Sequence, residues 1–158
     1  MTDSVRSACW LMCAASFFSS TTVVSADADL GTATIVVRPG APAVERTAAE
    51  VFVEEVGKRT GLTLPIAEDW PATGPAVAVL SGDASKLRGR PVPKGLAPDQ
   101  PDGYGVRVDA AGPTVWVVGA DPRGALFGVG HLLRKLDLRQ GSIRLSRPID
   151  VVTAPAYS

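Results

Sequence analysis

The strongest constraint in the sequence is a hairpin pattern that runs directly into a helix pattern. Residues 104–108 and 113–119 carry the alternating, β-branched side chains of strands, and turn-forming residues separate them. The second segment leads to Asp121, a favoured helix N-cap, and to Pro122, which is favoured at the first helical position. We therefore expect a β-hairpin whose second strand feeds a helix over residues 122–136.

The apolar side of this helix is interrupted by small residues. Its expected buried stripe consists of Leu126, Val129, Leu133 and Leu136, widened by Ala125 and Leu132. Gly124 and Gly128 are four residues apart, which allows a neighbouring backbone to approach closely. His131, the sole histidine, falls at the border of the stripe. We interpret it as a half-buried structural residue.

The first half of the chain predicts a strand, a helix and further strands. Residues 33–38 read as a strand, and a helix follows over 42–60, with Gly61 as its left-handed C-cap. The residues expected mainly in solvent on this helix are Glu45, Glu50, Glu54 and Lys58. The remaining expected segments are an edge strand at 62–66, a buried strand at 76–80, a long surface loop at 81–102 and a short strand at 142–145. This order predicts an α+β domain, with a mixed or mostly antiparallel sheet and two main helices packed on one face.

Composition excludes two classes of protein. The 158 residues contain 16 Lys and Arg against 16 Asp and Glu, and they contain no long basic run. A nucleic-acid-binding protein needs a cationic surface to neutralise phosphates, so we expect no nucleic-acid partner. The apolar fraction of 46% and the mixed charges likewise argue against a disordered chain.

The N-terminus has the three-part pattern of a secretory signal. Arg6 precedes an apolar run over residues 8–18, and small residues end the segment at Val24-Ser25-Ala26. We predict a signal peptide over residues 1–26, cleavage after Ala26, and an exported product in the periplasm or outside the cell. The alternative is an uncleaved membrane anchor, which the Ser- and Thr-rich end of the segment disfavours. After cleavage we expect no stable membrane insertion.

Cleavage would remove both cysteines, which lie at positions 9 and 13. A chain with one histidine and no cysteine lacks the usual zinc-binding constellations and a thiolate nucleophile. Glu54 and Glu55 point in different directions on a helix, so they cannot face each other across a sugar. We predict no catalytic residue, no metal site and no cofactor site. Trp70, in a Pro-flanked turn, is the one aromatic residue expected to contact a ligand, a glycan for example.

The stretch DGYGVRVDAAGPTVWVVGADPRGALFGVGHLLRKL, residues 102–136, resembles a small domain of secreted glycoside hydrolases. Family 20 hexosaminidases and α-glucuronidases carry this domain, sometimes called zincin-like, in front of the catalytic barrel. Upstream, AAEVFVEEVGKRTGLTLPI is similar to the first helix and edge strand of that domain. The resemblance implies a non-catalytic, N-terminal accessory domain over residues 27–150, with residues 151–158 starting a linker to a barrel absent from this chain.

The resemblance also implies a division of labour. Catalytic groups of such enzymes belong to a (β/α)8 barrel, which needs about 250 residues, so none of them is carried over to a position here. The expected function is to buttress that barrel, in cis or on a partner chain, as part of a carbohydrate-active glycosidase. The alternative is a stand-alone exported module that binds a glycan or a protein through the 81–102 loop and Trp70.

Overall fold

A six-stranded sheet forms the centre of the computed structural model, which describes residues 27–109 and 112–155. The predicted signal peptide, residues 1–26, lies outside the described residues. The strand order is β11-β7-β8-β4-β2-β3. The strands are β2 (Thr34–Val37), β3 (Ile66–Ala67), β4 (Ala76–Ser81), β7 (Tyr104–Asp109), β8 (Thr114–Gly119) and β11 (Asp150–Thr153). The pairs among β3, β2, β4 and β8 are parallel, whereas β7 pairs antiparallel with both β8 and β11, so the sheet is mixed.

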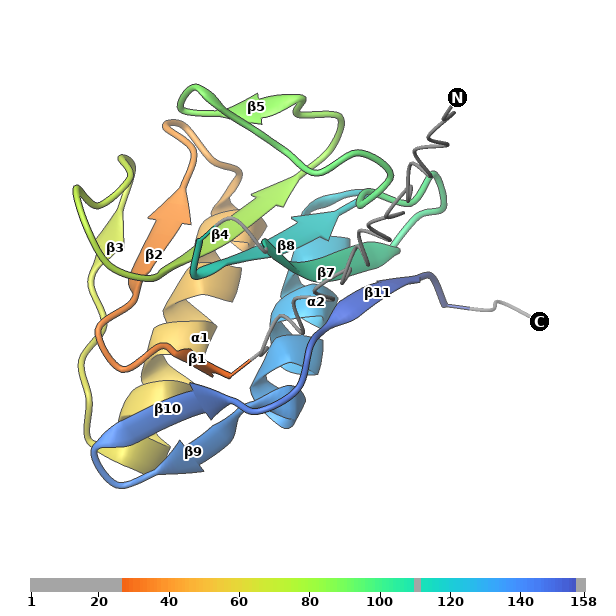
Figure 1. Ribbon diagram of the computed structural model, residues 1–158. Coiled ribbons are helices and arrows are strands. Elements are labelled where there is room, and N and C mark those ends of the chain that lie inside the picture. The colour runs from red at the N-terminus through yellow and green to blue at the C-terminus, as the bar shows by residue number, and fades with distance from the viewer. Residues whose placement is uncertain (1–26, 110–111, 156–158) are drawn as a thin grey trace, which may run out of the picture.

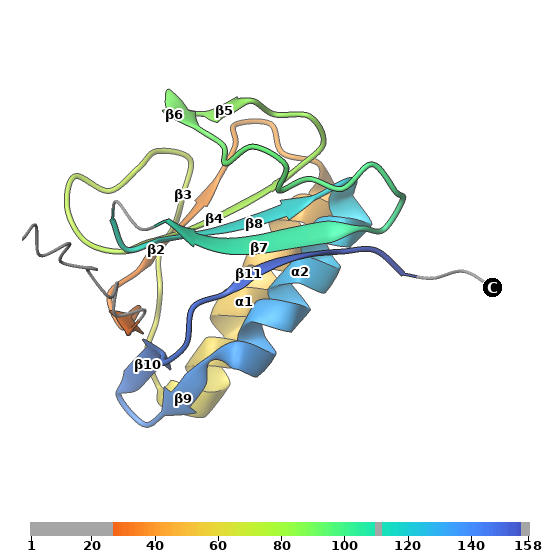
Figure 2. The same cartoon turned by 45° about the vertical axis from the view of Figure 1, so that its right-hand side comes forward.

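Two helices, α1 (Ala43–Thr60) and α2 (Pro122–Lys135), pack side by side on one face of this sheet (Figures 1 and 2). Their apolar side chains meet those of the strands in the main core. Fully buried members of that core include Ile35, Val37, Phe52, Val56, Val77, Val79, Val115, Val117, Val129 and Leu132. The predicted α+β class, with a mixed sheet and two main helices on one face, is confirmed.

Capping signals in the sequence place the helix ends as predicted. The Asp121 carboxylate accepts a hydrogen bond from the Gly124 N–H at 2.8 Å, and Pro122 opens α2. Gly61 ends α1 with a φ of 73°, a left-handed conformation that favours glycine. Both helices therefore begin and end within one residue of the predicted positions.

The small residues of α2 let it approach the sheet closely. A Cβ at Gly124 would overlap the carbonyl oxygen of Gly103, and a Cβ at Gly128 would lie 2.7 Å from a methyl carbon of Val117. Neither space admits a side chain, so the predicted close approach at these two glycines is confirmed.

The opposite face of the sheet is covered by the segment that follows β4. It was predicted as a long loop, and within it the structure forms a small hairpin of β5 (Lys86–Leu87) and β6 (Arg90–Pro91). Figure 2 shows this segment above the sheet, on the side away from the helices. Leu87 and Leu96 are buried there against Leu80, Trp116 and Val118 of the sheet, in a second core. The burial of Trp116, 2% exposed, agrees with its predicted core position.

A second, smaller sheet lies near the C-terminal ends of the helices (Figure 1). Its strand order is β1-β10-β9, with bounds Ala28–Asp29, Ser142–Leu145 and Asp137–Arg139 respectively. Strand β10 was predicted, whereas β1 and β9 were not. Ile143 and Leu145 of β10 are fully buried in the main core, so this sheet closes the end of the helix layer.

Strand β11 was also not predicted. It pairs with β7 from Asp150↔Arg107 to Thr153↔Tyr104 and forms one edge of the main sheet. It crosses the expected domain boundary at residue 150, because Val151 pairs with Val106 and packs against the main core. The linker interpretation of residues 151–158 stays a prediction for the part that follows this strand.

Candidate functional site

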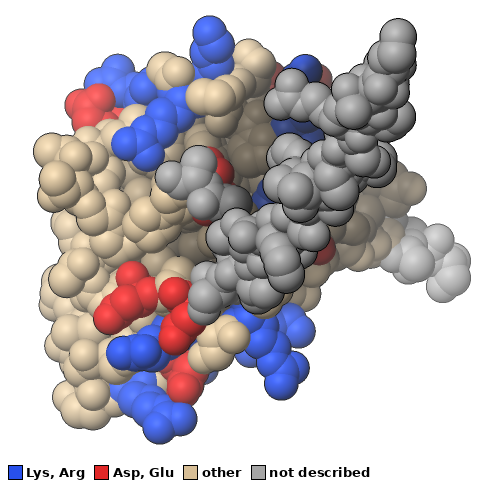
Figure 3. All heavy atoms as spheres, viewed as in Figure 1, with Lys and Arg blue, Asp and Glu red and all other residues tan. Residues whose placement is uncertain are grey.

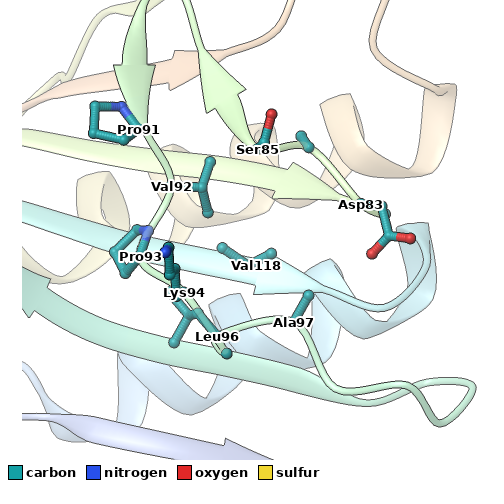
Figure 4. Close-up of a pocket in the computed structure, with 12 residues that line it drawn as sticks. Asp83, Ser85, Pro91, Val92, Pro93, Lys94, Leu96, Ala97 and Val118 are labelled. Carbon is teal, nitrogen blue, oxygen red and sulfur yellow. The ribbon is translucent and has the colours of Figure 1, made fainter.

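One candidate site is a pocket between the segment after β4 and the sheet. It has a volume of about 440 Å³. Figure 4 shows Val92, Leu96 and Val118 at its centre, with Asp83 at the end where β4 and β8 finish. The other labelled lining residues are Ser85, Pro91, Pro93, Lys94 and Ala97.

Backbone hydrogen bonds and one glycine hold this pocket in shape. The Val92 N–H donates to the Ser85 carbonyl at 3.0 Å, and the Gly82 N–H donates to the Gly119 carbonyl at 2.9 Å. Leu96 sits directly on Gly105 of β7, where a Cβ would overlap the Leu96 carbonyl. The pocket wall at Leu96 therefore packs directly on the sheet at Gly105, where there is no space for a side chain.

The lining of this pocket is mostly apolar, with a few polar side chains. Its apolar floor carries one hydroxyl, one carboxylate and one ammonium, from Ser85, Asp83 and Lys94. Sites for small molecules in proteins are typically lined by apolar side chains with a few polar groups among them. Figure 3 shows Lys and Arg side chains gathered over the β5–β6 hairpin, whereas acidic and basic side chains mix over β9 and β10.

Trp70, the ligand contact predicted from the sequence, does not line this pocket. It is half-buried, and its indole N–H donates to the Leu87 carbonyl at 2.9 Å. The Arg90 guanidinium lies 4.3 Å from the centre of its ring, and the Trp116 ring approaches edge-on at 5.4 Å. In the described structure Trp70 thus anchors the β5–β6 hairpin, and its contact with a ligand stays a prediction.

A buried carboxylate lies close to a second hollow, at the carboxyl ends of the parallel strands. Glu45 was expected in solvent, and that expectation is wrong, since its side chain is fully buried. One carboxylate oxygen accepts hydrogen bonds from the Ser81 hydroxyl at 2.6 Å and from the Arg38 guanidinium at 3.0 Å. Its other oxygen has no partner among the described residues. Arg38 and Ser81 line the hollow of about 490 Å³ beside it.

The strand-to-helix junction at Asp121 is occupied by its own carboxylate. One oxygen caps α2 at the Gly124 N–H, and the other accepts from the Asp102 N–H at 2.8 Å. The hydrogen bond from Asp102 is the main reason why the pKa of Asp121 is lowered. The carboxylate therefore fills the position that an anionic ligand would take at this helix N-terminus.

The side chain of His131, a residue of α2, faces Tyr104 of β7. Its Nδ1 is 3.1 Å from the Tyr104 hydroxyl, and its buried Nε2 has no partner among the described residues. Burial lowers the pKa of His131, and the charges of Lys135 and Arg134 lower it further. This geometry is that of a structural histidine that favours the neutral form.

Within residues 27–109 and 112–155, no three His, Cys, Asp or Glu side chains gather in a way that could hold a metal ion. The same residues contain no helix that is long and apolar enough to cross a membrane.

Comparison with known proteins places the fold. No family model matches the sequence, and no curated protein matches it. Among solved structures, the chain is similar to a family GH115 4-O-methyl-α-glucuronidase, BtGH115A, with a TM-score of 0.60 and 17% identity over 82% of this chain. It is also similar to the GH20 β-N-acetylhexosaminidase of Streptomyces coelicolor A3(2), with a TM-score of 0.57 and 15% identity over 85% of this chain.

A third neighbour is the GH20 exo-β-N-acetylglucosaminidase of Vibrio harveyi, with a TM-score of 0.55 and 12% identity over 82% of this chain. The matched regions make up only 18%, 24% and 17% of these three chains, in the order given. These three structural neighbours are two GH20 enzymes and a GH115 α-glucuronidase, and they belong to the two groups that the sequence resembles. The chain spans less than a quarter of the length of each.

Proposed function

We propose that this chain is a non-catalytic accessory domain of an exported, carbohydrate-active glycoside hydrolase of hexosaminidase or α-glucuronidase type. Its function is to buttress a catalytic barrel that other residues supply, in cis or on a partner chain. The observation that carries this proposal is the similarity of the fold to less than a quarter of glycosidase chains from two families. The sequence resemblance over residues 102–136 supports it independently.

The polar groups of the structure support a scaffolding function. Asp121 caps a helix, Glu45 joins α1 to β4 through Ser81, and His131 contacts Tyr104. Each of these titratable groups thereby ties one element to another. A barrel of about 250 residues is large enough to hold the catalytic groups that the proposal assigns elsewhere.

Intact mass and activity of the native secreted product test the proposal. The product is assayed on aryl glycosides of hexosamine and of glucuronic acid. We expect a species much larger than the 16.4 kDa of this chain, with glycosidase activity on one of the two substrates. A product no larger than 16.4 kDa that leaves both substrates intact would contradict the proposal.

Export is the second part of the proposal, and it rests on the signal-like residues 1–26. N-terminal sequencing of the product from the periplasm or the medium should begin at Asp27. A product that remains in the cytoplasm with Met1 intact would contradict export.

The alternative function is an exported module that binds a glycan or a protein. The observation that favours it is the pocket of Figure 4, with its apolar floor and three polar side chains. Titration with N-acetylglucosamine and glucuronic acid, monitored at Lys94 and Val118 by nuclear magnetic resonance, distinguishes the two functions. Saturable shifts at both residues would favour the binding module.

A further inference from the structure

A groove between α2 and the segment 146–155 is the strongest feature that the proposed function leaves unexplained. Figures 1 and 2 both show β11 passing beside α2. Two hollows, of about 350 and 430 Å³, lie along this line, and Arg134 lines both of them. We call this surface the α2–β11 groove.

The two ends of the groove differ in chemistry. At one end Phe127, Tyr104, Ala154 and Pro155 form a largely apolar hollow, which Thr153 and Arg134 also line, and Phe127 is 40% exposed. At the other end the exposed side chains of Arg134, Lys135 and Arg147 line the second hollow. None of these three cations forms an ion pair with the described residues, whereas the Asp150 carboxylate is already paired with Arg107 at 2.8 Å.

We propose that the α2–β11 groove is the surface on which the catalytic domain docks in cis, through an apolar side chain against Phe127 and carboxylates against the three cations. This inference rests on the proposed function, because it requires that domain. The groove suits a partner of opposite charge, since complementary potentials orient protein surfaces and unlike charges at a rim favour association. An exposed aromatic side chain beside a cationic rim has the composition of an interface core and its border.

Charge and position select this occupant over a second copy of the chain. In a symmetric dimer the same patch is buried on both copies, so the three cations of each copy would enter one interface and give it a high positive charge. Residues 153–155 form one wall of the apolar hollow, so a domain attached beyond them begins next to the groove. The similar solved structures are at least four times longer than the part that this chain matches, which leaves room for such a body.

Footprinting of the native secreted product tests the docking surface. Hydroxyl radicals oxidise exposed side chains, and Phe127 is compared with Val44 and Ile66, which expose 39% and 37% in this fold. After correction for intrinsic reactivity, we expect oxidation of Phe127 to be roughly threefold or more below that of the two controls, because the core of an interface is packed as densely as a protein interior. Acetylation should likewise be slower at Lys135 than at Lys86.

The intact mass of the same product separates the two proposals. A product with a further domain in which Phe127 and the controls react equally would overturn docking at this groove and leave the proposed function standing. A product that ends at Ser158 would overturn docking in cis, and it would overturn the proposed function as well if it also leaves both aryl glycosides intact. Concentration-dependent dimerisation that alone protects Phe127 would identify a second copy as the occupant and would also overturn the proposal.

Variants in the native product supply a second readout. Phe127→Ser is matched by Val44→Ser, and the charge reversal Arg134→Glu with Arg147→Glu is matched by Lys86→Glu with Lys94→Glu, two exposed cations on the other face of the sheet. We expect each groove variant to speed protease cleavage between the domains about tenfold, which corresponds to about 1.4 kcal/mol of lost docking free energy. The matched controls should cleave at the wild-type rate. Wild-type rates for both groove variants would overturn the proposal.

Discussion

Gly105 of β7 lies directly under the Leu96 carbonyl, so that a Cβ at residue 105 would overlap the carbonyl oxygen and also lie 2.6 Å from a Leu96 methyl carbon. This relationship joins a central strand to the segment that covers the sheet. Because Leu96 is fully buried among Trp116 and Val118, the covering segment cannot move away without opening the second core.

Gly105→Ala should therefore destabilise the domain. Overpacking of a filled core costs about 1–3 kcal/mol, and we expect a loss of unfolding free energy in that range. Chemical denaturation measures it. The matched control is Gly130→Ala in α2, where the nearest atom to an added Cβ is an Arg134 nitrogen at 3.6 Å. That substitution should stabilise the helix by about 0.5–1 kcal/mol. Equal effects of the two substitutions would contradict the packing argument.

Glu45→Ala should cost far more than substitution of an exposed acid on the same helix. Removing one partner of a buried ion pair costs about 3–5 kcal/mol, because the other charge loses its partner. Since the Arg38 side chain is 34% exposed and water can reach it, we expect a value near the lower end. Glu50→Ala, on the exposed side of α1, should change the unfolding free energy by less than about 0.5 kcal/mol. Similar values for the two variants in chemical denaturation would refute the assigned contacts of Glu45.

Stability should fall as the pH drops below neutral, partly because of His131. The folded state lowers the pKa of His131 below its ordinary value of 6.5, so the unfolded state binds a proton more readily. The loss of stability that His131 causes is absent well above pH 6.5, and it grows as the pH falls from 6.5 through the lowered pKa of the folded state. His131→Gln should flatten this part of the stability profile, measured by denaturation from about pH 8 to pH 5. Parallel profiles for the two proteins would show that His131 does not titrate in the folded state as its environment indicates.

Asp121 also makes the stability depend on pH, but it does so as a carboxylate and at lower pH than His131. Its lowered pKa means that the carboxylate stabilises the folded state at neutral pH, and this stabilisation is lost as the pH falls through the folded pKa. Asp121→Ala should cost about 1–2 kcal/mol at pH 7, because both the Gly124 and Asp102 N–H groups lose an acceptor. Asp121→Asn retains one acceptor oxygen and should cost less. A loss for Asp121→Ala that is the same at pH 7 and in strong acid would contradict this assignment.

Local signals predicted most of the elements, whereas long-range pairing escaped them. Asp121 and Pro122 located the start of α2, because a cap and its helix are adjacent in sequence. Strand β11 escaped because four residues near two prolines carry little periodicity, and the β7 edge that recruits them lies more than 40 residues away. The burial of Glu45 escaped for the same reason. Its partner Ser81 is 36 residues distant, and only the parallel pairing of β2 and β4 brings Arg38 and Ser81 together.

The contacts of Trp70 could not be predicted from the sequence either, because only the β5–β6 hairpin brings Leu87 and Arg90 next to its ring. A ligand that stacks on the face covered by Arg90 must displace that guanidinium, which lies 4.3 Å from the ring centre.

Arg90→Ala should therefore increase quenching of Trp70 fluorescence by acrylamide while leaving buried Trp116 protected. If the predicted glycan contact exists, this variant should also bind N-acetylglucosamine more tightly, because a cation–π contact of about 0.5–1 kcal/mol no longer competes. Increased quenching with no binding at any concentration would leave Trp70 only its structural function of anchoring the hairpin through Leu87.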